Sequence, residues 1–193
     1  MMPAAPAEVR GLPRIRYRGL HLPLHPHLLS EARAEALQTG TWQAAFTEAA
    51  FALAQSDDTA LIWGLGAGHV TAILAGKLGL PRVYVADPAP ESRRHLTALA
   101  WLNGLPRLKL VSFEDAQALA PTLLFADLAS APCPNLAAWP SLRAAAIEMG
   151  PEPGAADLAA LRAAAKTTGL RQDEALTAVS CMVFVRPRDR MGD

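Results

Sequence analysis

A glycine-rich turn near residue 65 constrains the fold of this chain more than any other feature. The segment Trp63-Gly-Leu-Gly-Ala-Gly-His69 directly follows a short apolar run, 60–63, and opens a stretch with helical periodicity. Glycines at such a junction let the backbone turn sharply and approach a ligand without a Cβ in the way. The helix behind the turn offers unpaired backbone N–H groups. The pattern therefore predicts a strand-turn-helix unit that binds a nucleoside cofactor.

An aspartate at the end of the next predicted strand supports this interpretation. Asp87 closes the run 82–86 and lies 19 residues beyond Gly68. Because neighbouring strands of a doubly wound sheet end side by side, its carboxylate can accept hydrogen bonds from both hydroxyls of a ribose. Gly64, Gly66, Gly68 and Asp87 are therefore the predicted cofactor-binding residues. A purely structural tight turn is the alternative.

The spacing of the glycines distinguishes between two classes of cofactor. A dinucleotide fingerprint needs glycine or alanine at the third position of G-x-G-x-x-G, and that position is His69 here. The chain instead has G-x-G-x-G, the arrangement of S-adenosylmethionine-dependent methyltransferases, in which no pyrophosphate has to lie on the helix. S-adenosylmethionine is thus the predicted cofactor, and an NAD(P)-dependent oxidoreductase is an alternative.

Apolar runs and helical segments alternate from residue 58 onward, and this alternation predicts an α/β fold. Repeated strand-helix units favour a doubly wound, mainly parallel sheet that is covered on both faces, with the last strand antiparallel to its neighbour. This is the Rossmann-like fold of the class I methyltransferases. The expected strands are 60–63, 82–86, 108–111, 122–126, 144–149 and 179–185, and the expected helices are 68–78, 89–102 and 155–168.

Residues 1–57 are expected to form an N-terminal extension, a short helical lead-in to the methyltransferase-like domain of residues 58–193. Ser30 is a suitable N-cap, because its hydroxyl can accept a hydrogen bond from the first turn of a helix. Alternating polar and apolar residues indicate a strand or hairpin before it. The extension is expected to contain a hairpin within 14–24, a helix over 31–38 and a helix over 42–55.

Composition and charge exclude several classes of protein. Hydrophobic residues make up 51% of the chain, and 18 basic residues balance 18 acidic ones, so a disordered chain is excluded and no net charge attracts nucleic acid or anionic membranes. Cys133 and Cys181 are not at metal-ligand spacing, so we expect no metal site and a reducing, cytoplasmic location. The N-terminus lacks the order of a signal peptide, and prolines interrupt the least charged stretch, 116–142, so no membrane association is expected.

Four further motifs follow the glycine turn at successive positions of the predicted sheet. They are Asp87-Pro-Ala-Pro90, Asn103-Gly104 at a helix end, Phe125-Ala-Asp-Leu128 and Ala146-Ile-Glu-Met-Gly-Pro151. Together with the glycines they resemble the FkbM family of methyltransferases, and the likeness spans about residues 58–170. The resemblance implies a class I methyltransferase fold and O-methylation of a hydroxyl on a small molecule or sugar.

Three carboxylates near the ends of predicted strands are further candidates. Asp115 matches the position where a methyltransferase acid meets the adenine amino group, or else it only favours the start of a short helix. Asp127 is the predicted catalytic residue, because it could orient the acceptor or accept its proton; a strand-end cap is its alternative role. Glu148 is a candidate because it lies on an otherwise apolar run.

Two positions depart from the family pattern and leave a second function open. Ile62 stands where such enzymes have an acidic residue, two positions before the first glycine. The segment Asp127-Leu-Ala-Ser130 stands where the family commonly has Asp-x-Glu-Gly. A noncatalytic subunit with the methyltransferase fold is therefore the alternative to an enzyme. A protein partner or a second copy of the chain is compatible with either function.

Overall fold

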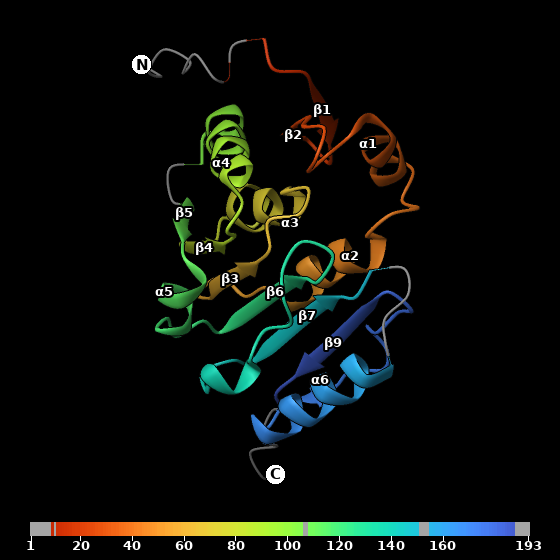
Figure 1. The fold of residues 1–193 in the computed structure, drawn as a ribbon, viewed down its shortest axis with the longest axis vertical. Coiled ribbons are helices and arrows are strands. Elements are labelled where there is room, and N and C mark those ends of the chain that lie inside the picture. Colours follow the sequence, from red (N-terminus) through yellow and green to blue (C-terminus); the bar gives the residue numbers. More distant parts are fainter. Residues whose placement is uncertain (1–8, 10, 106–107, 151–154, 188–193) are drawn as a thin grey trace.

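The computed structural model describes residue 9 and residues 11–105, 108–150 and 155–187 (Figure 1). Its main sheet contains β3 (Thr59–Trp63), β4 (Arg82–Ala86), β5 (Leu108–Val111), β6 (Leu123–Asp127), β7 (Ala144–Glu148), β8 (Arg171–Gln172) and β9 (Cys181–Val185). The strands lie in the order β5-β4-β3-β6-β7-β9-β8. The first five are parallel, and β9 runs antiparallel to both of its neighbours. The predicted doubly wound, mainly parallel α/β class is confirmed.

Strand β7 shows how packing overrides a weak local preference. Three of its five residues are alanines, which have low strand propensity. The strand nevertheless pairs along its length with β6 on one side and β9 on the other, and all five residues are buried. By contrast, β8 has only two residues at the sheet edge. It was not predicted, because two residues are too few to show an alternating pattern.

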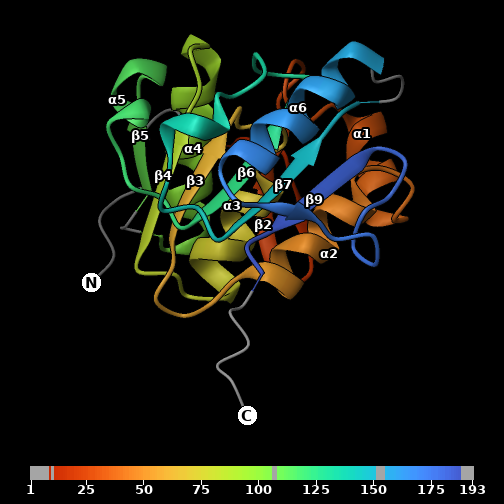
Figure 2. The ribbon, with the colours of Figure 1, turned by 90° about the horizontal axis from the view of Figure 1, so that it is seen from below.

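Helices cover both faces of the sheet (Figure 2). One face carries α2 (Ala44–Leu53), α3 (His69–Ala72), the π-helical turn η2 (Ile73–Lys77) and α4 (Pro90–Asn103); the other carries α5 (Phe113–Gln117), the short 3-10 helix η3 (Leu136–Ala138) and α6 (Ala155–Thr167). Two buried apolar clusters result, and Ile62 and Trp63 belong to different ones because side chains alternate along a strand. Among the described residues, no helix has the length and apolar character needed to cross a membrane.

The N-terminal extension packs against the helices that follow the glycine turn. Strands β1 (Arg14–Tyr17) and β2 (Leu20–Pro23) form the predicted hairpin, apart from the main sheet, and α1 (Glu31–Gln38) begins at Ser30 as expected. Asn103, at the end of α4, donates to the backbone carbonyl of His21 at 2.7 Å and accepts from its N–H at 2.8 Å. The same apolar cluster includes residues of the extension and of α3 and α4. One hydrophobic core thus continues across residue 57.

Candidate functional site

A cavity of about 680 Å³ lies where the carboxyl ends of the central parallel strands meet the N-terminal extension. The strand order reverses between β3 and its neighbours β4 and β6, and ligands of open α/β sheets bind at such a switch point. The lining includes Gly66, Asp87, Asp127 and Glu148 from the strand ends, and Arg33, Trp42 and Gln43 from the extension. Three predicted site residues therefore meet at one cavity: Gly66, Asp87 and Asp127.

The three glycines of the turn have different surroundings. Gly66 lines the cavity with a φ of +52°, and a Cβ there would collide with the carboxylate of Asp127. Gly64 is buried, and a Cβ would lie 2.6 Å from the hydroxyl of Ser130. Gly68 is buried against α4, and a Cβ there would lie 3.2 Å from Nε2 of His95. The structure therefore exposes one glycine to the cavity, while the other two allow close packing of the turn.

Asp87 connects the glycine turn to the start of α4. One carboxylate oxygen accepts from the backbone N–H of Leu65 at 2.7 Å, and the other accepts from that of Ala89 at 2.9 Å. The side chain is buried but lines the cavity. Each carboxylate oxygen has a further lone pair, so Asp87 can still accept hydrogen bonds from a ligand.

Asp127 is buried, and neighbouring donors fix its orientation. Its Oδ1 accepts from the backbone N–H of Ala129 at 3.0 Å, and its Oδ2 accepts from the side-chain amide of Gln43 at 3.1 Å. Burial raises the pKa of Asp127 above its ordinary value, whereas these two donors and the nearby guanidinium of Arg33 favour the ionised form. Both oxygens of this carboxylate are thus already engaged by the protein.

Glu148 is the neighbour of Asp127 across the β6–β7 pairing and is only 4% exposed. Within the described part of the chain, its Oε2 has no hydrogen-bond partner. Burial raises the pKa of Glu148 to about 7; the charge of Asp127 adds to this shift, and the Ser180 hydroxyl opposes it. The described residues contain no group of three or more His, Cys, Asp or Glu placed to hold a metal ion. The two carboxylates form a site for hydrogen bonding and proton transfer.

Asp115 does not belong to the residues that line this cavity. It is exposed on α5, where the Ser112 hydroxyl donates to its carboxylate at 2.8 Å and its own N–H donates to the same hydroxyl at 2.9 Å. This reciprocal pair stabilises the first turn of a helix. The observed geometry is thus that of the alternative role, a helix start, and adenine binding by Asp115 stays a prediction.

Sequence reasoning missed two buried residues of the cavity. Gln43 is 6% exposed with a left-handed φ of 52°, and its Oε1 has no partner among the described residues. The Ser92 hydroxyl, at the start of α4, is fully buried and likewise has no described partner. Both fall within helices expected from the sequence, 42–55 and 89–102, but no motif marks either one as a site residue. Their positions depend on how the extension and α4 pack around the strand ends.

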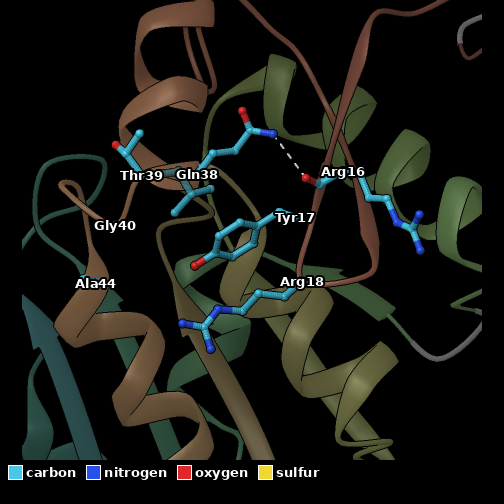
Figure 3. Close-up of a pocket in the computed structure, with 8 residues that line it drawn as sticks. Arg16, Tyr17, Arg18, Gln38, Thr39, Gly40 and Ala44 are labelled. Atoms are coloured by element: carbon cyan, nitrogen blue, oxygen red, sulfur yellow. Dashed lines mark hydrogen bonds between the residues drawn. The ribbon is translucent and has the colours of Figure 1, made fainter.

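A second hollow, of about 420 Å³, lies on the extension between the hairpin and α1 (Figure 3). The Tyr17 ring points into it, and the Gln38 amide donates to the backbone carbonyl of Arg16 at 3.2 Å. Arg18 pairs with the carboxylate of Glu48 at 2.5 Å. None of the buried polar atoms that lack a partner among the described residues lies in this hollow. Among the described residues, this hollow therefore lacks the buried, unpaired side-chain atoms that belong to the lining of the larger cavity.

Solved structures with the same fold include several methyltransferases. The chain is 20% identical to the ribosomal protein L11 methylase of Lactobacillus delbrueckii subsp. bulgaricus, covering 78% of this chain and 79% of that one with a TM-score of 0.57. The chain is 13% identical to the precorrin-6y C5,15-methyltransferase of Geobacter metallireducens GS-15, with 79% of this chain and 78% of that one covered and a TM-score of 0.55. The fold is that of class I methyltransferases.

A third similar structure is M. jannaschii TYW2 in complex with AdoMet, at 12% identity, with 89% of this chain and 82% of that chain covered and a TM-score of 0.53. No protein-family model and no curated protein matches the chain. At these identities the likeness shows the fold alone. Membership of the FkbM family stays a prediction.

Proposed function

We propose that this protein is an S-adenosylmethionine-dependent methyltransferase that acts on a hydroxyl of a small molecule or sugar. The observation that carries the proposal is the set of unsatisfied polar atoms around the cavity. Gln43, Ser92 and Glu148 line it, and each has a buried side-chain oxygen with no hydrogen-bond partner among the described residues. Buried polar atoms are nearly always paired in folded proteins, so three unpaired ones at a single cavity indicate a polar ligand.

The residues around Gly66 fit a nucleoside cofactor with an amino-acid end. Asp87 can accept from ribose hydroxyls, and the Asp127 carboxylate beside Gly66 suits an ammonium group. Arg33, in the lining of the same cavity, suits a carboxylate. A cavity of about 680 Å³ is within the range of cofactor and small-molecule sites. When bound, S-adenosylmethionine supplies an electrophilic methyl group on a sulfonium sulfur.

The missing acid at Ile62 is compatible with this proposal. Ile62 is 2% exposed and belongs to the same apolar cluster as Phe46 and Phe125. A carboxylate at that position would be buried among apolar side chains. In this chain Asp127 and Arg33 are available to hold the charged end of the cofactor instead.

Several independent features support catalysis over a purely structural subunit. The cavity reaches both Asp87 and Asp127, while Trp63 and His69 are buried away from it in the protein interior. The resemblance to the FkbM family supports a hydroxyl acceptor, and the solved methyltransferases with this fold support methyl transfer. In this proposal the carboxylates at the ends of β6 and β7 are the groups available to orient the acceptor or to take its proton.

Calorimetry with S-adenosylhomocysteine and, separately, with NADH tests the cofactor class. We expect binding of the first and none of the second; the opposite result would replace the proposal with an oxidoreductase. Gly66→Val should abolish binding, because its side chain would displace the Asp127 carboxylate. Gly40→Val is the matched control, since Gly40 also has a positive φ (+72°) but open space around it. Binding without methyl transfer to any of a panel of hydroxylated acceptors would indicate a noncatalytic subunit.

A further inference from the structure

Hydrogen bonding assigns different roles to the two carboxylates at the ends of β6 and β7. Asp127 and Glu148 are each 4% exposed and line the same cavity. Both oxygens of Asp127 accept hydrogen bonds, from Ala129 and Gln43. Glu148 Oε2 has no partner within the described chain. Hydrogen bonds to a carboxylate stabilise its ionised form and so make it a weaker base; Asp127 accepts two of them, whereas Glu148 Oε2 accepts none and is the oxygen better suited to remove a proton.

We infer that Glu148 is the residue that takes the proton of the acceptor hydroxyl, while Asp127 is a fixed hydrogen-bond acceptor. The inference rests on the proposed function and names the base for that reaction. The O–H bond breaks, and its proton bonds to Glu148 Oε2. The electron pair left on the oxygen forms the bond to the methyl carbon, and the bond from this carbon to sulfur breaks with its pair remaining on sulfur. The neutral Glu148 then returns the proton to water.

The surroundings of Glu148 suit this role near neutral pH. Burial and the neighbouring charge of Asp127 raise the pKa of Glu148 to about 7, and the Ser180 hydroxyl moderates the shift. Cys181, its partner across the β7–β9 pairing, is neutral in this range because burial raises the pKa of its thiol to about 12. A base is most effective when its pKa lies near the working pH.

The other charged residues that line the cavity do not change the separate roles of Glu148 and Asp127. Arg33 acts on Asp127, where it favours the ionised form. His27 and Glu91 are further ionisable residues that line the cavity. An experiment on Glu148 therefore includes a variant of His27 as a control.

Kinetics of isosteric variants test the inference. Glu148→Gln keeps the shape but accepts no proton, so kcat should fall at least a hundredfold, the scale of general base catalysis. Its affinity for S-adenosylhomocysteine should stay within threefold of wild type.

The kcat of the wild type should rise through about pH 7 and then level off; His27→Asn should keep this rise. Asp127→Asn should instead weaken S-adenosylhomocysteine binding and keep the rise with its midpoint moved to lower pH, because the charge of Asp127 contributes to the raised pKa of Glu148. Glu114→Gln, exposed on α5, is the control for the substitution itself.

A titration that needs no acceptor completes the test. The side-chain carboxyl carbon of Glu148, assigned by its loss in Glu148→Gln, should titrate in carbon NMR with a midpoint near 7. A midpoint near 4.5, or full kcat in Glu148→Gln, overturns the inference and leaves the proposed function intact. A wild-type protein that does not bind S-adenosylhomocysteine overturns the proposed function, and the inference with it.

Discussion

His69 packs between the glycine turn and the N-terminal extension, and its replacement tests how well water is excluded from this contact. The imidazole is 2% exposed and lies near the rings of Tyr17, Trp42 and Phe46, at centroid distances of 6.1, 6.3 and 6.4 Å. Neither ring nitrogen has a hydrogen-bond partner in the described protein. Burial, with a smaller contribution from Arg18, lowers the pKa of His69 from 6.5 to about 3.

The expected magnitude follows from this shift. Around pH 5 the histidine is neutral in the folded protein but protonated in the unfolded chain, so the free energy of unfolding falls as the pH falls below about 6.5. One pKa unit corresponds to about 1.36 kcal/mol, and about 1.5 units separate pH 6.5 from pH 5. His69 alone should therefore lower stability by about 2 kcal/mol between pH 8 and pH 5.

His69→Leu should remove this pH dependence, because leucine has no ionisable group. Leucine also has a similar volume, and no hydrogen bond is lost because neither ring nitrogen has a partner in the described protein. Relative to wild type, the variant should gain about 2 kcal/mol between pH 8 and pH 5 in urea unfolding followed by tryptophan fluorescence. The difference between proteins is needed because other groups titrate too. His95, with its pKa lowered to about 4 by burial, acts in the same direction as His69, whereas Glu148 contributes stability that is lost as the pH rises through about 7.

His27→Asn is the matched control, since His27 is exposed, and its effect on stability should be the same at both pH values. An effect of His69→Leu that is equal at pH 5 and pH 8 would refute the reasoning. The imidazole would then be protonated in the folded protein or open to solvent. In either case the aromatic rings of the extension would not bury the imidazole away from water.

Three further substitutions test the site. Asp87→Asn replaces one carboxylate oxygen by an NH2 group, which cannot accept from the backbone N–H that faces it. S-adenosylhomocysteine should therefore bind about ten- to hundredfold more weakly by calorimetry, and an unchanged affinity would show that Asp87 does not belong to the site. Gln43→Ala frees the Asp127 carboxylate and should weaken the same binding about tenfold, whereas Gln38→Ala, in the outer hollow, should not change it. Ile62→Glu buries an unpaired charge, so urea unfolding should show a loss of about 3–5 kcal/mol, and a neutral effect would contradict its apolar surroundings.

The sheet could be predicted from the sequence because its signals are local. Each of β3, β4, β6 and β9 is a mainly apolar run that has glycine, proline or aspartate at, or within two residues of, at least one end. Asn103-Gly104 ends α4 as expected, with Gly104 in the left-handed conformation. Parallel strands joined by helices then allow few arrangements. What the pattern did not contain is β8, whose pairing with β9 is fixed by position in the sheet and not by its own residues.

Half of the site could be predicted for the same topological reason. Asp87 and Asp127 end parallel strands on either side of β3, so any doubly wound sheet brings them to one edge. Of the three glycines of the motif, Gly66 lines the cavity while Gly64 and Gly68 allow close packing, and cofactor binding by the latter two stays a prediction. A motif identifies the turn; the packing around the turn decides which of its residues a ligand can reach.

The other half of the site depends on tertiary packing that no local pattern specifies. Gln43 reaches Asp127 across 84 positions of sequence, and it does so from a left-handed conformation that is costly for a residue other than glycine. The extension is positioned by contacts with α3 and α4, such as those of His69 and Asn103, which are far from its own sequence. Because the extension supplies one wall of the cavity, those of its residues that do not hold the cofactor can determine which acceptor fits. Replacing Leu28 in that wall, with Arg33 and Gln43 kept, should therefore alter acceptor choice while the affinity for S-adenosylhomocysteine is retained.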